Sequence, residues 1–190
     1  MSYFLIIISA IFVNNIVLAQ FLGICPFLGV SKRISTGIGM TGAVTFVMVI
    51  ATIVTWLIQN TILIPFGVTY LQTISFILVI ASLVQLVEIV MKKVSPPLYQ
   101  ALGVFLPLIT TNCAILGVAI MTVSKEFNIV EAVVFSMASA VGFGLALITF
   151  AGIREQLDLM NIPKGMQGAP IALVVAGILA LAFMGFAGMV

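Results

Sequence analysis

Cys25 and Cys113 are the only cysteines of this 190-residue chain, and each begins a nearly identical phrase. Residues 25–30 read Cys-Pro-Phe-Leu-Gly-Val, and residues 113–118 read Cys-Ala-Ile-Leu-Gly-Val, 88 positions later. Both phrases lie within long apolar segments. Thiolates are ligands for soft metals and iron–sulfur clusters. A metal-capable ligand that recurs at equivalent points of two halves indicates a paired site in a duplicated membrane protein.

Two other roles stay open for these cysteines. A free cysteine is often only a small buried hydrophobic residue, and a disulfide is a poor structural staple in the middle of a membrane. An iron–sulfur cluster of the [2Fe-2S] type takes four thiolates, whereas this chain supplies two. If the cysteines hold such a cluster, the other two thiolates must come from a second protein, and a paralogous subunit built in the same way is the obvious donor.

The composition of the chain is that of a membrane protein. Hydrophobic residues make up 63% and charged residues 6%, whereas soluble domains carry about 25% charged residues. The sequence has no histidine and a net charge of +2, which excludes imidazole ligands and gives no indication of nucleic-acid binding. No Walker loop, catalytic triad or carboxylate cluster is present, so we expect no stand-alone active site.

Six apolar segments are long enough to cross a bilayer, for which an α-helix needs about 20 residues. We therefore expect an all-α polytopic membrane protein with a single membrane domain over residues 1–190. The first 31 residues contain no Lys or Arg, so the cationic start of a cleaved signal peptide is missing and the first segment is expected to remain as a span. The predicted spans are 3–30, 39–58, 70–91, 99–122, 129–151 and 170–189.

Basic residues predict the orientation of these spans. The connections after spans one, three and five hold six of the seven basic residues, and the opposite side holds only Lys125. By the positive-inside rule, both termini lie on the non-cytoplasmic side. Because each half has three spans, the second half must enter the membrane from the opposite side. The sequence thus predicts two inverted three-helix repeats, approximately 1–93 and 94–190. The six basic residues are Lys32, Arg33, Lys92, Lys93, Arg154 and Lys164.

Spans one and four, which carry the cysteines, are predicted to be discontinuous. As a straight helix, span one would be roughly 42 Å long, against about 30 Å for the hydrocarbon core. Proline removes a helical hydrogen bond, and amides or hydroxyls can satisfy the freed backbone groups. We expect an interruption near the midplane in each span; a tilted helix with a proline kink is the alternative. The residues concerned are Asn14, Asn15, Gly23 and Pro26 in span one, and Pro107, Thr110, Thr111 and Asn112 in span four.

Residues 14–31 and 106–118, which contain the two cysteine phrases, closely resemble the first and fourth segments of the RnfA/NqrE family. The shorter sequences Gly142-Phe-Gly, Gly152-Ile-Arg-Glu and Phe183-Met-Gly-Phe-Ala-Gly188 are similar as well. The resemblance covers essentially the whole chain. It implies a multi-pass subunit of the bacterial cytoplasmic (inner) membrane within an Rnf complex, a ferredoxin:NAD⁺ oxidoreductase, or within the related Na⁺-translocating NADH:quinone reductase. Both couple electron transfer to Na⁺ or H⁺ transport.

The resemblance also implies a cofactor and partners. In the family, this subunit pairs with a homologous subunit of opposite topology (RnfE-like, or NqrD), and both contribute cysteines to an intramembrane [2Fe-2S] cluster. Carried over, the ligands here are Cys25 and Cys113, with two further thiolates from the partner. The other expected partners are Rnf subunits that carry flavin and iron–sulfur groups, and membrane lipid. A small secondary transporter with a midplane cation site and an electron-inert scaffold are the alternatives.

Overall fold

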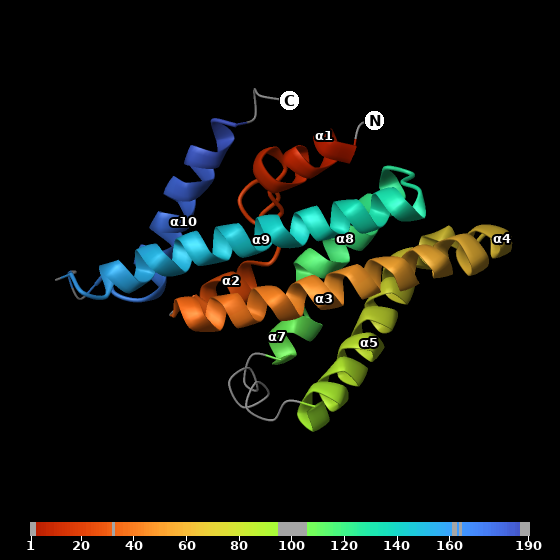
Figure 1. Cartoon of the computed structure of the whole chain (residues 1–190), viewed down its shortest axis with the longest axis horizontal. Helices are drawn as coiled ribbons and strands as arrows, with labels where there is room; N and C mark the ends of the chain where they lie inside the picture. Colours follow the sequence, from red (N-terminus) through yellow and green to blue (C-terminus); the bar gives the residue numbers. More distant parts are fainter. Residues whose placement is uncertain (1–2, 32, 95–105, 161–162, 164, 187–190) are drawn as a thin grey trace.

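The computed structural model describes residues 3–31, 33–94, 106–160, 163 and 165–186, which form helices and turns with no strand among them (Figure 1). An all-α fold was predicted, and this part of the prediction is confirmed. The helices are α1 Tyr3–Ile8, the π-helix η1 Ser9–Val13, α2 Ile24–Val30, α3 Ile34–Ile58, the π-helix η2 Gln59–Leu63, α4 Ile64–Phe66, the 3-10 helix η3 Thr69–Leu71, α5 Gln72–Val94, α7 Leu106–Thr110, α8 Cys113–Ser124, α9 Ile129–Leu157 and α10 Ala169–Met184.

Four helical segments of the described chain are long and apolar enough to cross a membrane: 34–66, 69–90, 107–124 and 129–157. They correspond to predicted spans two to five. The first and last predicted spans contain shorter apolar helices, Tyr3–Val13 and Ala169–Met184. The predicted start of span four at residue 99 and the end of span six at residue 189 lie outside the described residues.

The second span is longer than predicted. Residue 58 was expected to end it, with Pro65 in the following break, yet the chain stays helical to Phe66. Proline lacks a backbone N–H, but the π-turn of η2 rearranges the hydrogen bonds just before it, and Pro65 lies in the first turn of α4. Gly67, at φ 66° in the left-handed region, ends the helix instead, as glycine commonly does.

The interruptions predicted for spans one and four are present. In span one, helix ends at Val13 and resumes at Ile24, with turns between. In span four, α7 ends at Thr110 and α8 begins at Cys113, with Asn112 in an extended conformation at φ −72° and ψ 110°. Each cysteine therefore lies at the start of the helix that follows a break.

Helices α3 and α9 pack side by side along the centre of the molecule, with α1 and α10 on one side of this pair and α5 on the other (Figure 1). The fully buried side chains include Met40 and Met48 of α3 and Phe143, Leu147 and Phe150 of α9. Of the four long segments, the one formed by α9 is the most enclosed and the one formed by α5 the least. Large apolar side chains such as Phe46, Leu78 and Leu181 are exposed, which suits a surface that faces lipid or neighbouring subunits.

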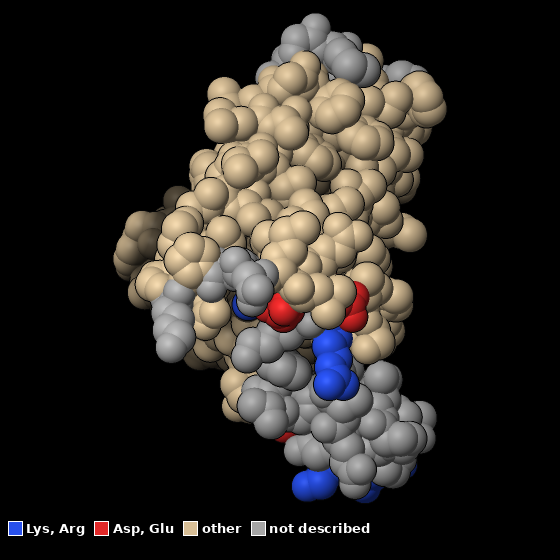
Figure 2. Space-filling model, turned by 90° about the vertical axis from the view of Figure 1, so that its left-hand side faces the viewer, with Lys and Arg blue, Asp and Glu red and all other residues tan. Residues whose placement is uncertain are grey.

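A group of charged side chains lies at the end of the molecule where α3 begins and α9 ends (Figure 2). Figure 2 views this end and shows blue and red atoms in its lower part beside a broad tan surface. Arg33 precedes α3, and Arg154 lies in the last turn of α9. The two basic positions are neighbours because Arg154 binds the segment that leads into α3, as described below.

Candidate functional site

The two cysteine phrases meet at the breaks. The backbone N–H of Gly23 donates a hydrogen bond to Cys113 Sγ, with a nitrogen–sulfur distance of 2.9 Å. Gly23 is two residues before Cys25, so residues 90 positions apart in the sequence form one site. Cys25 is exposed at the surface of the chain, and Cys113 is partly buried. That both thiols are metal ligands stays a prediction.

Gly23 can occupy its position only as glycine. Its φ of 80° lies in the left-handed region, which side chains with a Cβ disfavour. A Cβ at this position would lie 3.0 Å from Phe143 Cε2 and 3.1 Å from Ala114 Cβ. Both neighbours are fully buried, so the surrounding core has no room to yield. The glycine therefore lets the backbone of the first break approach Cys113 closely enough to donate its N–H.

Asn112 fixes the start of α8 at the second break. Its Oδ1 accepts a hydrogen bond from the backbone N–H of Ala114 at 3.0 Å, as an N-cap residue does. Its Nδ2 is buried and has no partner among the described residues, and the side chain as a whole is 3% exposed. A buried amide without an acceptor is costly, so the residue that precedes Cys113 in the sequence carries an unpaired donor.

Asn15 fixes the turns of the first break. Its Nδ2 donates to Gly142 O at 2.9 Å and to Ile11 O at 3.0 Å, and its Oδ1 accepts from the N–H groups of Val17 and Leu18. The residue is fully buried. One amide thus satisfies backbone groups that the interruption of the helix leaves open, and joins the break to α9.

The glycine of each cysteine phrase receives a leucine from the other interrupted span. A Cβ at Gly29 would lie 3.3 Å from Leu108 Cδ1 of α7, and a Cβ at Gly117 would collide with Leu22 of the first break. The shared Gly of the two phrases therefore allows reciprocal close packing between spans one and four. Sequence reasoning found both glycines in the repeat but gave them no role.

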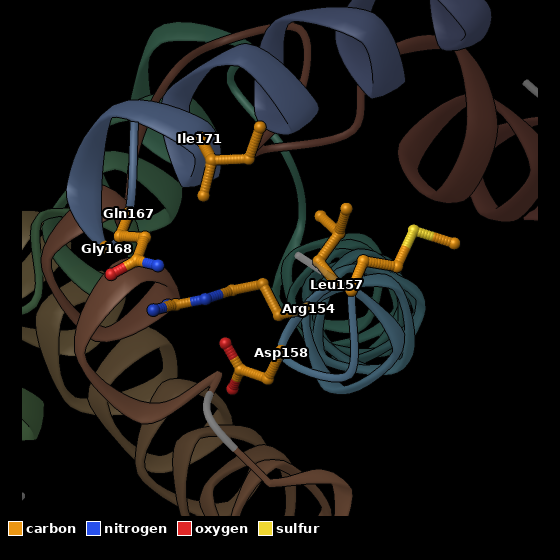
Figure 3. Close-up of a pocket in the computed structure, with 7 residues that line it drawn as sticks. Arg154, Leu157, Asp158, Gln167, Gly168 and Ile171 are labelled. Carbon is orange, nitrogen blue, oxygen red and sulfur yellow. The ribbon is translucent and has the colours of Figure 1, made fainter. Parts of the chain in front are cut away.

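Arg154 holds the C-terminal end of α2. Its Nη1 donates to Leu28 O at 2.9 Å and to Ser31 Oγ at 2.8 Å, and its guanidinium lies 5.8 Å from the centre of the Phe150 ring. Figure 3 shows Arg154 extending from α9 across a cavity of about 300 Å³, between Gln167 and Asp158. A cation at the C-terminal end of a helix is stabilised by the helix dipole. Arg154 was predicted only as an orientation marker, so its contact with α2 is new.

A family model described as "Rnf-Nqr subunit, membrane protein" matches residues 3–190. The chain belongs to this family. The resemblance inferred from the cysteine phrases is thereby confirmed.

Curated relatives match the chain from end to end. The A subunit of the Na⁺-translocating ferredoxin:NAD⁺ oxidoreductase complex of Acetobacterium woodii is 58% identical over 189 residues, which cover 100% of this chain and 98% of the relative. The A subunit of the ion-translocating oxidoreductase complex of Syntrophotalea carbinolica is 58% identical over 186 residues (98% and 96%), and that of Edwardsiella ictaluri is 50% identical over 189 residues (100% and 98%).

Within the described residues of this Rnf-Nqr chain, no three His, Cys, Asp or Glu side chains are grouped as metal ligands. What the geometry provides is two thiols, an N–H donor to one of them, and an unpaired buried amide. Such a donor set suits a group with sulfur acceptors that a second protein helps to hold.

Proposed function

We propose that the chain is the A-type membrane subunit of an ion-translocating ferredoxin:NAD⁺ oxidoreductase. In this proposal, Cys25 and Cys113 provide two of the four thiolates of a [2Fe-2S] cluster, and a homologous RnfE-like subunit of opposite topology provides the other two. The observation that carries the proposal is the hydrogen bond from Gly23 to Cys113, because it brings the two cysteine phrases together at breaks within apolar segments.

The residues around the two thiols fit such a cluster. Cys113 is the first residue of α8, where backbone N–H groups lack partners within the helix and the positive end of the helix dipole favours a thiolate. The unpaired Nδ2 of Asn112 and the N–H of Gly23 are donors of the kind that hydrogen-bond to cluster sulfur and adjust its potential. When bound, the cluster would supply one-electron transfer.

The chain's own residues act by positioning. Gly23 and Asn112 hold Cys113, Arg154 holds the helix that carries Cys25, and Asn15 fixes the first break. The core packed around the breaks is largely apolar, which lowers the local dielectric. Cys25 remains exposed on the isolated chain, so a partner can reach it.

The contacts between helices support two inverted repeats. Taken as whole spans, the contacts form reciprocal pairs. Span two packs on span five (α3 on α9), span four packs on span two (α8 on α3) as span one does on span five (η1 on α9), and span three packs on span four (α5 on α8) as span six does on span one (α10 on η1). The half-helices that make these contacts differ between the repeats, because α8 follows its break and η1 precedes its break. The contacts of Gly29 and Gly117 are reciprocal in the same way: Gly29 of span one faces Leu108 of span four, and Gly117 of span four faces Leu22 of span one. Six spans related by a two-fold axis in the membrane plane would produce this pattern.

Charge supports the proposed orientation in the cytoplasmic membrane. Arg33 and Arg154 lie at one end of the α3–α9 pair, which the positive-inside rule makes cytoplasmic. Trp56 and Lys125 lie at the other end, where Trp56 Nε1 donates to Phe127 O at 2.9 Å. Tryptophan is common at membrane interfaces. Both termini would then be on the non-cytoplasmic side.

Iron analysis of the purified intact complex tests the proposal. Cys25→Ser and Cys113→Ser, made singly, should each remove about two iron atoms and two acid-labile sulfides per complex, because a [2Fe-2S] cluster needs all four thiolates. The same variants should lose one EPR signal of the reduced complex and the transfer of electrons from ferredoxin to NAD⁺. Ala176→Ser is the control, since it makes a similarly small change in α10, a helix that carries neither cysteine.

The outcome separates the alternatives. Full iron content and electron transfer in either cysteine variant would refute the ligand assignment. Retained electron transfer with both cysteines replaced would identify the chain as a scaffold. Ion transport without any iron assigned to this subunit would favour a secondary transporter.

A further inference from the structure

Helix α5 lies at the edge of the molecule and exposes one of its faces (Figure 1). The helix packs on α3, α7 and α8, and its buried side chains are Phe76, Ile80 and Val84, which are four residues apart. Leu78 and Ile89 are instead 65% and 62% exposed. Lipid alone could cover such apolar side chains, so they identify no partner by themselves.

Gln85 is unsuited to a position that faces lipid. Its side chain is exposed, and no hydrogen bond from it occurs within the described part of the chain. Along α5 it lies about 10 Å from Lys92 in the last turn and about 20 Å from Gln72 at the start, so it lies inside the hydrocarbon region of this span. Hydrocarbon offers an amide no hydrogen-bond partner. Polar side chains at this depth therefore almost always face other helices.

Gln85 belongs to a stripe of the kind along which two helices pack. The stripe consists of Leu78, Ser82, Gln85 and Ile89, which we call the α5 seam; all four are exposed, and they are spaced by four, three and four residues. This alternation is that of a heptad repeat, which keeps one stripe of a helix against a partner helix. The hydroxyl of Ser82 is satisfied by Leu78 O of its own helix at 2.9 Å. The contribution of Ser82 is its small size, which lets two helix backbones approach closely.

The counterpart of α5 in the predicted inverted repeat has no such seam. Helix α10 contains no polar side chain between Ala169 and Met184, and its exposed residues Leu173, Ile178 and Leu181 are aliphatic. A span of this family can thus present a wholly apolar face to its surroundings. The amide at the centre of the exposed face of α5 therefore favours a protein neighbour over lipid.

We propose that the α5 seam is the docking site for one membrane-spanning helix of another subunit of the complex. That helix carries an uncharged polar side chain at the depth of Gln85, because an amide has both donors and an acceptor and a neutral partner satisfies it without placing a charge in the membrane. Its backbone comes closest at Ser82. The inference rests on the proposed function in requiring an assembled complex of several subunits, and it uses neither cysteine.

Photocrosslinking in the purified intact complex, reconstituted in phospholipid vesicles, tests the docking site. The photoreactive amino acid p-benzoylphenylalanine in place of Leu78 should capture a second subunit, and mass spectrometry should locate the new bond in a membrane-spanning segment of that subunit. The same replacement at Leu181, which is 70% exposed on α10, is the matched control and should capture mainly lipid. Capture at position 78 of lipid alone, or of a second copy of this chain, would overturn the inference.

Two substitutions then test the role of the seam in this contact. Gln85→Leu should raise the dissociation constant of the captured subunit, measured from the captured fraction on dilution in detergent, by about three- to tenfold, the range for one hydrogen bond between membrane helices. Ser82→Phe fills the middle of the seam and should abolish capture at position 78, whereas Ala182→Phe, at an exposed small residue of α10, should leave it unchanged. Equal or tighter association in Gln85→Leu, or normal capture in Ser82→Phe, contradicts the proposed docking.

The cluster proposal has separate readouts. Cys25→Ser and Cys113→Ser should remove iron and leave capture at position 78 unchanged, and Gln85→Leu should leave the iron content of the undiluted complex unchanged. Normal capture without iron at this subunit would refute the cluster and leave the docking site standing. Iron at the cysteine site, with only lipid captured at position 78, would refute the docking site and leave the cluster standing.

Discussion

Replacing Gly23 by alanine tests whether the close approach of the two breaks depends on a missing side chain. Gly67 provides a matched control, because both glycines have left-handed backbones, at φ 80° and 66°. A Cβ at Gly67 would have nothing within 4 Å, whereas one at Gly23 would press on Phe143 and Ala114. The two substitutions therefore share the backbone strain and differ in packing.

The expected magnitudes follow from these contacts. A left-handed conformation costs an alanine about 1–2 kcal/mol, so Gly67→Ala should lower the free energy of unfolding by about that amount. Gly23→Ala adds a carbon at 3.0 Å and 3.1 Å from two fully buried groups, and overpacking of this kind costs about 1–3 kcal/mol more. The difference in the free energy of unfolding between the two variants therefore measures the cost of overpacking around Gly23.

Hydrogen exchange of peptides from α9, measured by mass spectrometry in the intact complex, reports the opening of this chain alone. Gly23→Ala should lower the protection of α9 amides against exchange by about tenfold to a hundredfold more than Gly67→Ala does. The EPR signal that we assign to the cysteine site should change only in Gly23→Ala. Equal loss of protection in the two variants, with unchanged EPR signals, would show that the space around Gly23 is not limiting and that our account of the break is wrong.

Five further substitutions, at four positions, probe the same framework. Arg154→Met should destabilise the complex by about 1.5–3 kcal/mol in thermal unfolding, since two charge-assisted hydrogen bonds are lost; Arg154→Lys should recover only part. Asn15→Leu should cost more than about 3 kcal/mol by the same measurement, because several buried backbone groups lose their partner. Gly117→Ala should destabilise the chain, while Gly177→Ala, with open space around it, should stabilise α10 by about 0.5–1 kcal/mol; a reversed order would contradict the packing account.

Sequence patterns predicted much of this fold because a membrane-spanning helix can be recognised from its long run of apolar residues. The apolar runs gave the helices, and Asn, Pro and Thr within them indicated the two interruptions, which lie next to Cys25 and Cys113. Repetition of the cysteine phrase indicated that its two copies belong together, and the bond from Gly23 to Cys113 agrees with that. These signals are local in the sequence or repeat within it.

Other features depend on contacts that no local pattern contains. The continuation of helix beyond residue 58 depends on a π-turn that shifts hydrogen bonds around Pro65, and composition alone marked that proline as a break. The contact of Arg154 with α2 joins residues 126 positions apart. Gln59 looked like an ordinary polar residue at the end of a span, and only its burial without a partner distinguishes it.

The position of Cys25 depends on contacts outside its own helix. With seven residues, α2 is too short to be stable alone. Its second residue, Cys25, is exposed, while Phe27 is buried and stacks on Phe150 at 4.2 Å, and Arg154 binds its last turn. All of these anchors come from α9, which also supplies Phe143 beneath Gly23. One enclosed helix therefore sets the position of the first cysteine phrase, and a partner protein would meet Cys25 on a helix that this chain already holds in place. This preorganisation explains why we expect Arg154→Met to alter the EPR signal of the cysteine site although Arg154 touches neither thiol.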